Sequence, residues 1–274
     1  MTAGKFMGSD VGIYACPTCK VLLRREESVL RCARCSQAYP IRQGIPDFIV
    51  QELSRSADPV LRRMRFIDQI APIYETKLWY PIILNVYGGF HSLSFAQLVS
   101  TVAQQIGSTN GRVLDIACGP GTFGRRIASP SREVFGIDIS MGMLRQGAAY
   151  TAREGIANVH FARARVEALP FEDGLFDATL CCGSLHLFGE TVTTLREMAR
   201  TMKPGAILAV FTFTAGRGGV LRYPRIREWM RREHGLHEFD LPEMEHHLTT
   251  SGFKDFQPEV SGSILTFCAH KQPA

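Results

Sequence analysis

The feature that most constrains the fold is the stretch RVLDIACGPGTF at residues 112–123. A short apolar run carries Asp115 and then breaks at Gly119-Pro120-Gly121 before a helical segment. In open α/β sheets, a strand followed by a tight glycine turn and a helix start places a ligand at the carboxyl end of the strand. Glycine is required in such a turn because a side chain would block close approach of the backbone to the ligand. The sequence therefore predicts an α/β fold with a ligand site at this turn.

The same turn also has the spacing G-x-G-x-x-G, which occurs in dinucleotide-binding proteins. Here, however, an acid lies inside the strand, four residues before Gly119. In the form hydrophobic-Leu-Asp-hydrophobic-x-Cys-Gly-x-Gly, the stretch resembles motif I of the class I S-adenosylmethionine-dependent methyltransferases. S-adenosylmethionine carries a cationic amino-acid end and a sulfonium instead of a phosphate, and an acidic strand end attracts both charges.

Further blocks resemble the same family in the expected order. Strand 134–138 ends in Asp138 and runs into GIDIS-MGMLRQ, and a carboxylate there can accept from both hydroxyls of a ribose. Later blocks are EALPF at 167–171, D-x-x-F-D at 173–177 before strand 178–182, KPG at 203–205 before strand 207–213, and a closing pair at 253–259 and 263–269. The resemblance implies a Rossmann-like, seven-stranded, mostly parallel sheet with helices on both faces in residues 108–274.

The resemblance also implies which residues hold the cofactor. Asp115 and the two turn glycines would hold the methionine end, Asp138 and Ile139 the ribose, and Met143 and Val166 the adenine. The full expected set is Asp115, Ala117, Gly119, Gly121, Asp138, Ile139, Met143, Arg165, Val166 and Cys182. One position departs from the family pattern, because Arg165 stands where an acid usually accepts from the adenine amine. Arginine only donates hydrogen bonds, so either the backbone of residues 165–166 holds adenine or Arg165 turns away.

Two C-x-x-C pairs lie near the N-terminus, separated by twelve residues. Their members are Cys16, Cys19, Cys32 and Cys35. Two such pairs supply four thiolates, a set that suits tetrahedral Zn²⁺, and a structural metal would stabilise a segment too short to bury its own core. Metal-free or redox thiols are the alternative. With YPI and GIP following, the segment resembles a Trm112-like zinc ribbon, so we expect residues 1–50 to form a structural zinc module docked on the catalytic domain.

Residues 51–107 are expected to form a linker, at 51–60, and a helical cap. The cap resembles an F-D-x-I-A-x-x-Y-D segment that covers the cofactor in small-molecule methyltransferases, matched here by Phe66, Asp68, Ile70, Ala71 and Tyr74. Tyr74 would then reach the pocket, although aromatic packing of the cap explains it equally well. Helix breakers are expected at Pro72, Pro81 and Gly88-Gly89, and helical spacing predicts a buried helix from Phe95 to Ile106.

The second candidate catalytic residue besides Tyr74 is His186, which follows strand 178–182. A histidine at the mouth of the site has a pKa suited to a general base near neutral pH, and packing is its alternative role. The preceding Cys181 and Cys182 are expected to be small core residues and not nucleophiles. The arginine-rich insertion at 214–241 could dock an anionic substrate or simply form a solvated helix face.

The totals exclude several classes of protein. The chain is 45% hydrophobic and 21% charged, as in globular proteins, and it has no apolar run of the about 18 residues that a membrane span requires. Its first residues lack the apolar core of a secretory signal. We therefore expect a cytoplasmic protein with reduced thiols. The net charge of +5 permits nucleic-acid binding without favouring it.

Together these patterns predict an S-adenosylmethionine-dependent methyltransferase acting on an oxygen or carbon atom of a small, apolar molecule. The aromatic cap and the motif pattern resemble the quinone-type branch of the family. Two alternatives stay open. One is methylation of a ribosomal or transfer RNA base, because a zinc ribbon also precedes this fold in a guanine-N1 rRNA methyltransferase family. The other is a non-catalytic interaction partner. Methylation of exocyclic base amines is disfavoured, because CCGS follows strand 178–182 where those enzymes carry [DNS]-P-P-[YF].

Overall fold

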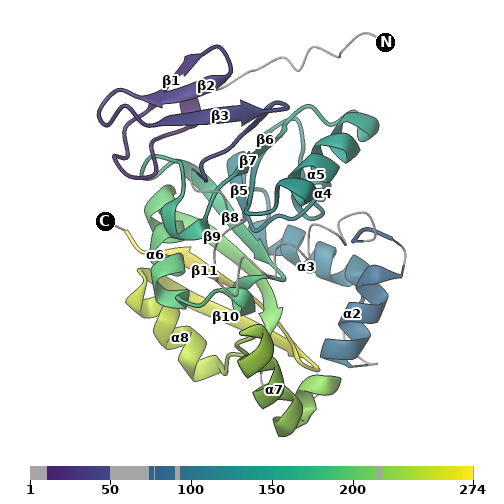
Figure 1. Cartoon of the computed structure of the whole chain (residues 1–274). Coiled ribbons are helices and arrows are strands. Elements are labelled where there is room, and N and C mark those ends of the chain that lie inside the picture. Colours follow the sequence, from purple (N-terminus) through teal and green to yellow (C-terminus); the bar gives the residue numbers. More distant parts are fainter. Residues whose placement is uncertain (1–10, 50–73, 77, 90–92, 215–217, 274) are drawn as a thin grey trace.

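The computed structural model describes residues 11–49, 74–76, 78–89, 93–214 and 218–273. Its main element is a seven-stranded sheet with the strand order β10-β11-β9-β8-β5-β6-β7 (Figure 1). The strands are β5 Gly111–Ile116, β6 Arg132–Asp138, β7 Val159–Arg163, β8 Phe176–Cys182, β9 Met202–Phe213, β10 Phe253–Ser261 and β11 Ile264–Lys271. Strands β5 to β9 pair in parallel, whereas β11 pairs antiparallel with β9 and β10. The predicted mostly parallel sheet is confirmed.

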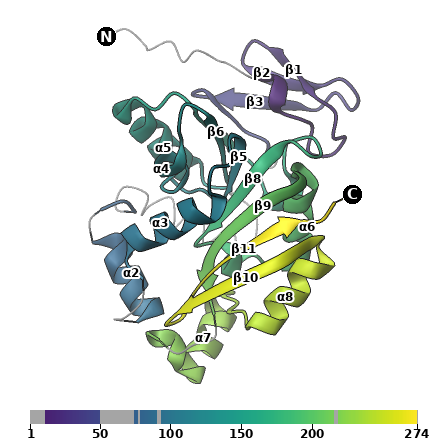
Figure 2. The ribbon, with the colours of Figure 1, turned by 180° about the vertical axis from the view of Figure 1, so that it is seen from behind.

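Helices cover both faces of this sheet (Figures 1 and 2). They are α2 Trp79–Gly88, α3 Phe95–Ile106, α4 Gly124–Ile127, α5 Met141–Glu154, α6 Thr191–Thr201, α7 Pro224–His234 and α8 Leu241–Thr250. Successive residues of β5 point into two different cores. Val113 packs in the core that includes α3 and α5, and Leu114 in the core that includes α6 and α8. Among the described helices, none is long and apolar enough to span a bilayer.

The predicted helix from Phe95 to Ile106 is confirmed as α3, and Ser94 caps it by accepting from Gln97 N–H. The expected break at Pro81 is wrong. Helix α2 begins at Trp79, so Pro81 lies in its first turn, where proline is tolerated because that N–H has no helical partner. The helix ends at Gly88, as expected. The predicted linker 51–60, Pro72 and the cap positions before Tyr74 lie outside the described residues.

The N-terminal module is a small antiparallel sheet of β1 Leu23–Glu26, β2 Val29–Cys32, β3 Ala38–Arg42 and β4 Ile45–Pro46. It docks on the edge strand β7 and the segment after it. Phe48 N–H donates to the Arg163 carbonyl at 2.8 Å, and Ala15 N–H donates to the Pro170 carbonyl at 2.9 Å. The ring of Tyr14 stacks on Phe171, with centroids 5.5 Å apart. The module and the large sheet therefore share one continuous core.

Candidate functional site

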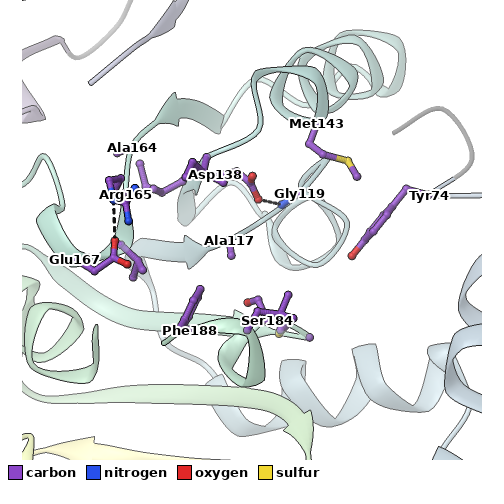
Figure 3. Close-up of a pocket in the computed structure, with 16 residues that line it drawn as sticks. Tyr74, Ala117, Gly119, Asp138, Met143, Ala164, Arg165, Glu167, Ser184 and Phe188 are labelled. Atoms are coloured by element: carbon purple, nitrogen blue, oxygen red, sulfur yellow. Dashed lines mark hydrogen bonds and ion pairs between the residues drawn. The ribbon is translucent and has the colours of Figure 1, made fainter. Parts of the chain in front are cut away.

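A pocket opens at the carboxyl ends of β5, β6 and β8, where the glycine turn follows β5 (Figure 3). It encloses about 910 Å³ of empty space, part of it open to solvent. Most residues of the expected cofactor set line it, together with the cap residue Tyr74: Ala117, Gly119, Asp138, Ile139, Met143, Arg165, Val166 and Cys182. Asp115, Gly121 and His186 are not among its lining residues. The structure therefore has a cavity at the carboxyl edge, where the sequence predicts a ligand site.

Asp138 is the acid that faces this pocket. It ends β6 and is only 9% exposed. One of its carboxylate oxygens accepts from Gly119 N–H and the other from Ser140 N–H, both at 2.8 Å. The Ser140 hydroxyl in turn accepts from Met143 N–H and caps α5. A carboxylate oxygen has two lone pairs, so Asp138 is held rigidly and can still accept hydrogen bonds from a ligand.

Asp115 lies behind the glycine turn. It is 2% exposed, and its carboxylate accepts from Gly124 N–H at 3.1 Å. Burial raises the pKa of this carboxyl to about 7, the Gly124 hydrogen bond partly offsets that rise, and the nearby Asp138 charge adds to it. Gly121 is also structural in this geometry. Its φ is +71°, and a Cβ there would lie 2.8 Å from the Phe161 ring. Asp115 and Gly121 thus lie beneath the glycine turn and do not line the pocket themselves.

Arg165, the position that departs from the family pattern, pairs with a neighbouring acid. Arg165 points to Glu167, with Nε 3.4 Å from the carboxylate, and both side chains line the pocket (Figure 3). The sequence left open whether the backbone of residues 165–166 holds adenine or Arg165 turns away, and both stay predictions; in the structure Arg165 lines the pocket beside Glu167. Glu167 belongs to the EALPF block that matches the family pattern, and its carboxylate is a hydrogen-bond acceptor at the pocket wall.

The cap reaches the pocket through Tyr74, whose side chain approaches Gly119: a Cβ at Gly119 would lie 3.8 Å from the tyrosine ring. The next residue, Glu75, pairs with the buried Arg125 at 2.5 Å and accepts from the Thr122 hydroxyl. Arg125 also binds Glu154 at 2.5 Å, so one guanidinium joins the cap to α4 and α5. Burial and the Asp138 charge raise the pKa of Tyr74 to about 12. Its phenol therefore stays protonated at neutral pH.

His186 lies on the 3₁₀ helix η5 Leu185–Leu187 and is buried away from the pocket lining. Its Nδ1 is 3.3 Å from the Thr212 hydroxyl, and its ring packs edge-on against Phe213 with centroids 4.9 Å apart. The surroundings of the side chain correspond to the packing role that the sequence left open. The general-base role stays a prediction.

Several lining residues were not in the expected set. They are Ile137, Ala164, Glu167, Gly183, Ser184, Leu187 and Phe188. Most follow or precede expected residues directly, and the segment 183–188 comes immediately after β8. The rule that ligands bind outside the carboxyl ends of strands would have found this segment, because β8 lies next to β5 in the sheet. Cys181 is fully buried, as predicted, whereas Cys182 borders the pocket.

The four N-terminal cysteines form a second candidate site. Their Sγ atoms all lie within 4.8 Å of one another, and Cys16 and Cys35 are 3.8 Å apart at sulfur. Tetrahedral zinc with Zn–S bonds of about 2.3 Å requires sulfur separations of about 3.8 Å, so the donor set and its spacing fit the ion. Backbone N–H groups of Cys19 and Cys35 point at the sulfurs of Cys16 and Cys32. These features are typical of a closed site with four protein ligands.

Residues 113–205 match the family model of the methyltransferase domain. They include the glycine turn, Asp138 and the strand β8 beside them. The chain contains a class I S-adenosylmethionine-dependent methyltransferase domain.

Named relatives agree with this domain. The chain is 37% identical to the ubiquinone/menaquinone biosynthesis C-methyltransferase UbiE of Ectopseudomonas mendocina over 54% of its own length and 59% of that protein. It thus spans little more than half of that relative. An uncharacterized chloroplastic methyltransferase of Arabidopsis thaliana is 23% identical over 96% of this chain and 79% of that protein.

The methyltransferase fold also recurs in solved structures. One is a chain from the complex between the Haloferax volcanii Trm112 methyltransferase activator and a methyltransferase. It superimposes with a TM-score of 0.59 at 15% identity, covering 76% of this chain and 98% of that one. At this level of identity the likeness extends to the fold.

Proposed function

We propose that the chain binds S-adenosylmethionine in the pocket and transfers its methyl group to an oxygen or carbon atom of a small, apolar acceptor. The observation that carries the proposal is the Asp138 carboxylate, fixed by Gly119 and Ser140 at the end of β6 and facing the cavity. A carboxylate held in this way accepts from both hydroxyls of a ribose without having to be reoriented.

The other lining residues suit the remaining parts of the cofactor. Met143 and Val166 offer apolar surfaces for adenine, and Glu167 offers the acceptor for its amine. Ala117 and Gly119 border the space for the methionine end. Asp115, buried behind the turn, supplies the negative charge that attracts the ammonium and sulfonium. A cationic cofactor relieves the cost of an ionised Asp115, because opposite charges favour ionisation of a buried carboxyl.

When bound, S-adenosylmethionine supplies an already activated methyl group. The work left to the protein is alignment and exclusion of water. Tyr74 can contribute to both tasks. It covers the glycine turn, and its protonated phenol can donate a hydrogen bond to an oxygen of the methyl acceptor. The ion pairs of Arg125 with Glu75 and Glu154 hold that cap residue over the turn. Tyr74 and His186 remain our candidate catalytic residues, Tyr74 as a hydrogen-bond donor and His186 as a base.

The acceptor class is inferred from two observations. The relatives that share 35–38% identity with the chain over about 110–150 residues include enzymes named for quinone C-methylation. Apolar side chains make up part of the pocket lining, Ile137, Leu187 and Phe188 among them. An apolar aromatic acceptor fits such walls better than a charged one.

We further propose that the cysteines bind one structural zinc ion and that residues 1–50 act as a fixed support for the pocket. Asp47, 2% exposed, accepts from Arg163 at 3.2 Å, and Arg163 donates to the Ile139 carbonyl at 2.8 Å. The ribbon thereby braces the strand end that carries Ile139 and the start of the adenine wall. Residues 51–107 then form the linker and the helical cap over the pocket, and residues 108–274 form the catalytic domain.

The test of cofactor binding is calorimetry with the zinc-loaded chain and S-adenosylmethionine. Loss of two hydrogen bonds to a charged acceptor, at about 1.5–3 kcal/mol each, predicts that Asp138→Ala weakens binding at least about 100-fold. Asp173→Asn is the matched control, because that side chain is 75% exposed and lies outside the pocket. Unchanged affinity in Asp138→Ala would remove the ribose assignment.

The test of the acceptor is a mass-spectrometric search for extract molecules that gain a methyl group, run beside purified RNA. A methylated small molecule is the expected product. Methylated RNA, formed at a rate that falls steeply with salt as phosphate contacts are screened, would instead support the RNA alternative. Binding of S-adenosylmethionine without any methylated product would favour a non-catalytic role.

A further inference from the structure

Helix α2 presents an apolar stripe to solvent. Leu78, Ile82 and Val86 are 69%, 54% and 41% exposed. They are spaced four residues apart and therefore lie on one side of the helix, while Leu84 on another side is buried in the core. Within Trp79–Gly88 there is no charged residue to interrupt the stripe. Contiguous exposed apolar surface of this kind marks an interaction site in a globular protein.

Helix α7 adds aromatic and basic groups. Its exposed residues Arg225, Trp229 and Arg232 recur at helical spacing, and Trp229 is 55% exposed. At the start of the helix, Tyr223 is exposed, and the Arg222 guanidinium lies 4.6 Å above its ring centroid. Exposed tryptophan, tyrosine and arginine residues are typical of elements that lie at the boundary between lipid headgroups and hydrocarbon.

The segment 222–232 is strongly basic. It contains five arginines and one glutamate, which gives a net charge of +4. Glu228 pairs with Arg231 and Arg232. Among the described residues, neither Arg222 nor Arg225 forms an ion pair, so their charges are available to an anionic surface.

The two helices lie at the same end of the molecule, away from the N-terminal ribbon (Figures 1 and 2). The 3₁₀ helix η6 Val220–Arg222 packs between them, and the chain leading into it touches the end of α2. A Cβ at Gly219 would lie 2.3 Å from the Val86 carbonyl oxygen, so the two backbones are in direct contact. The apolar stripe and the basic segment thus belong to elements that are packed together at one end of the domain.

We infer that this end binds the surface of a membrane that contains anionic lipids. The α2 stripe enters the headgroup region, Trp229 and Tyr223 lie at the boundary, and the arginines contact lipid phosphates. The charge complementarity of segment 222–232 selects an anionic lipid surface over an uncharged partner. This binding goes beyond the proposed methyl transfer and does not depend on it, because it needs neither cofactor nor acceptor.

The experiment is co-sedimentation of the zinc-loaded full chain with vesicles of phosphatidylcholine alone and of phosphatidylcholine with one-third phosphatidylglycerol. The wild type is expected to bind the anionic vesicles, and less so at high salt. Arg222→Gln/Arg225→Gln should weaken the partition coefficient about 30-fold, at about 1 kcal/mol per arginine near the surface. Arg24→Gln/Arg34→Gln, which removes two exposed charges from the ribbon, should leave it unchanged.

The apolar half of the surface is tested with Ile82→Ser/Val86→Ser, which should weaken partitioning about tenfold or more because buried hydrocarbon is lost. Its control is Val260→Ser on β10, 47% exposed. Equal S-adenosylmethionine affinity and unfolding midpoint in all variants show that each is folded. Absence of wild-type binding to either vesicle overturns the inference, and so does equal binding by the wild type, Arg222→Gln/Arg225→Gln and Ile82→Ser/Val86→Ser. So does a wild-type dimer that Ile82→Ser/Val86→Ser dissociates and that binds no vesicle, since the stripe would then join two copies of the chain.

Discussion

The substitution Asp115→Asn should make the empty protein more stable and the binding of its cofactor weaker. The wild-type carboxyl is buried, and its pKa is raised from 3.8 to about 7. Between these values the folded chain binds more protons than the unfolded chain, so the free energy of unfolding falls as pH rises from about 4 to about 7. Above pH 7 the carboxyl is ionised in both states, and the full cost of burying its charge is subtracted from the free energy of unfolding. At 1.36 kcal/mol per pKa unit it amounts to about 4 kcal/mol.

Asparagine keeps the shape of aspartate and can accept from Gly124 N–H, but it does not ionise. Its extra amide hydrogens add a cost that is the same at every pH, so the useful quantity is the change with pH. When the pH rises from 5 to 8, ionisation of Asp115 should lower the free energy of unfolding of the wild type by about 3 kcal/mol. The variant lacks this carboxyl and should not show that loss. The measurement is urea unfolding of both proteins at the two pH values, with zinc and without cofactor.

Asp173→Asn serves as the control, because that side chain is 75% exposed and its ion pair with Arg200 is of the surface type that contributes little to stability. If the stability difference between wild type and Asp115→Asn is the same at pH 5 and pH 8, the carboxyl is not destabilised by burial and the reasoning fails. The predicted loss of cofactor affinity in Asp115→Asn is tested separately from its stability. A variant that is more stable and yet binds S-adenosylmethionine as tightly as the wild type would show that Asp115 does not attract the methionine end.

Two further predictions concern the ribbon and the candidate base. The purified chain should contain close to one zinc ion by elemental analysis, and the variant Cys16→Ser/Cys32→Ser should contain none. We proposed that the N-terminal module supports the pocket through Arg163, so this variant should also bind S-adenosylmethionine about tenfold more weakly. The loss corresponds to about 1–1.5 kcal/mol for one hydrogen bond lost from the pocket wall. Wild-type affinity in a zinc-free variant would contradict the bracing. For His186→Gln, an essential base should lower kcat by about 100-fold or more and flatten its pH profile near neutrality. A normal pH profile with a lower unfolding midpoint would assign His186 to packing.

The sheet and the position of Asp138 could be predicted from the sequence because both depend on local patterns. Apolar runs fixed the strands, and the acid at the end of the run 134–138 has to lie at the carboxyl edge wherever that strand sits. Contacts between individual side chains could not be predicted in this way. Arg165 was recognised as a departure from the family, but its pairing with Glu167 depends on the turn of η4 Val166–Ala168. The expected break at Pro81 failed for a related reason, since a proline in a first turn and one in a helix interior look alike in sequence.

The pocket is completed by residues that lie outside the matched domain model. The matched domain model spans 113–205, whereas Tyr74 lines the cavity from outside it and Asp47 braces Arg163 from 116 residues away. Glu75, the neighbour of Tyr74, pairs with the buried Arg125, and the buried Asp47 pairs with Arg163. Breaking such a pair costs more than the pair itself contributes, because one charge is left without a partner. Glu75 and Asp47 therefore attach the segments before Gly111 to the large sheet at separate points, Glu75 at the glycine turn and Asp47 beside Ile139. Under the proposed function, loss of either ion pair through a substitution of Glu75 or Asp47 should weaken cofactor binding even though residues 113–205 are unchanged.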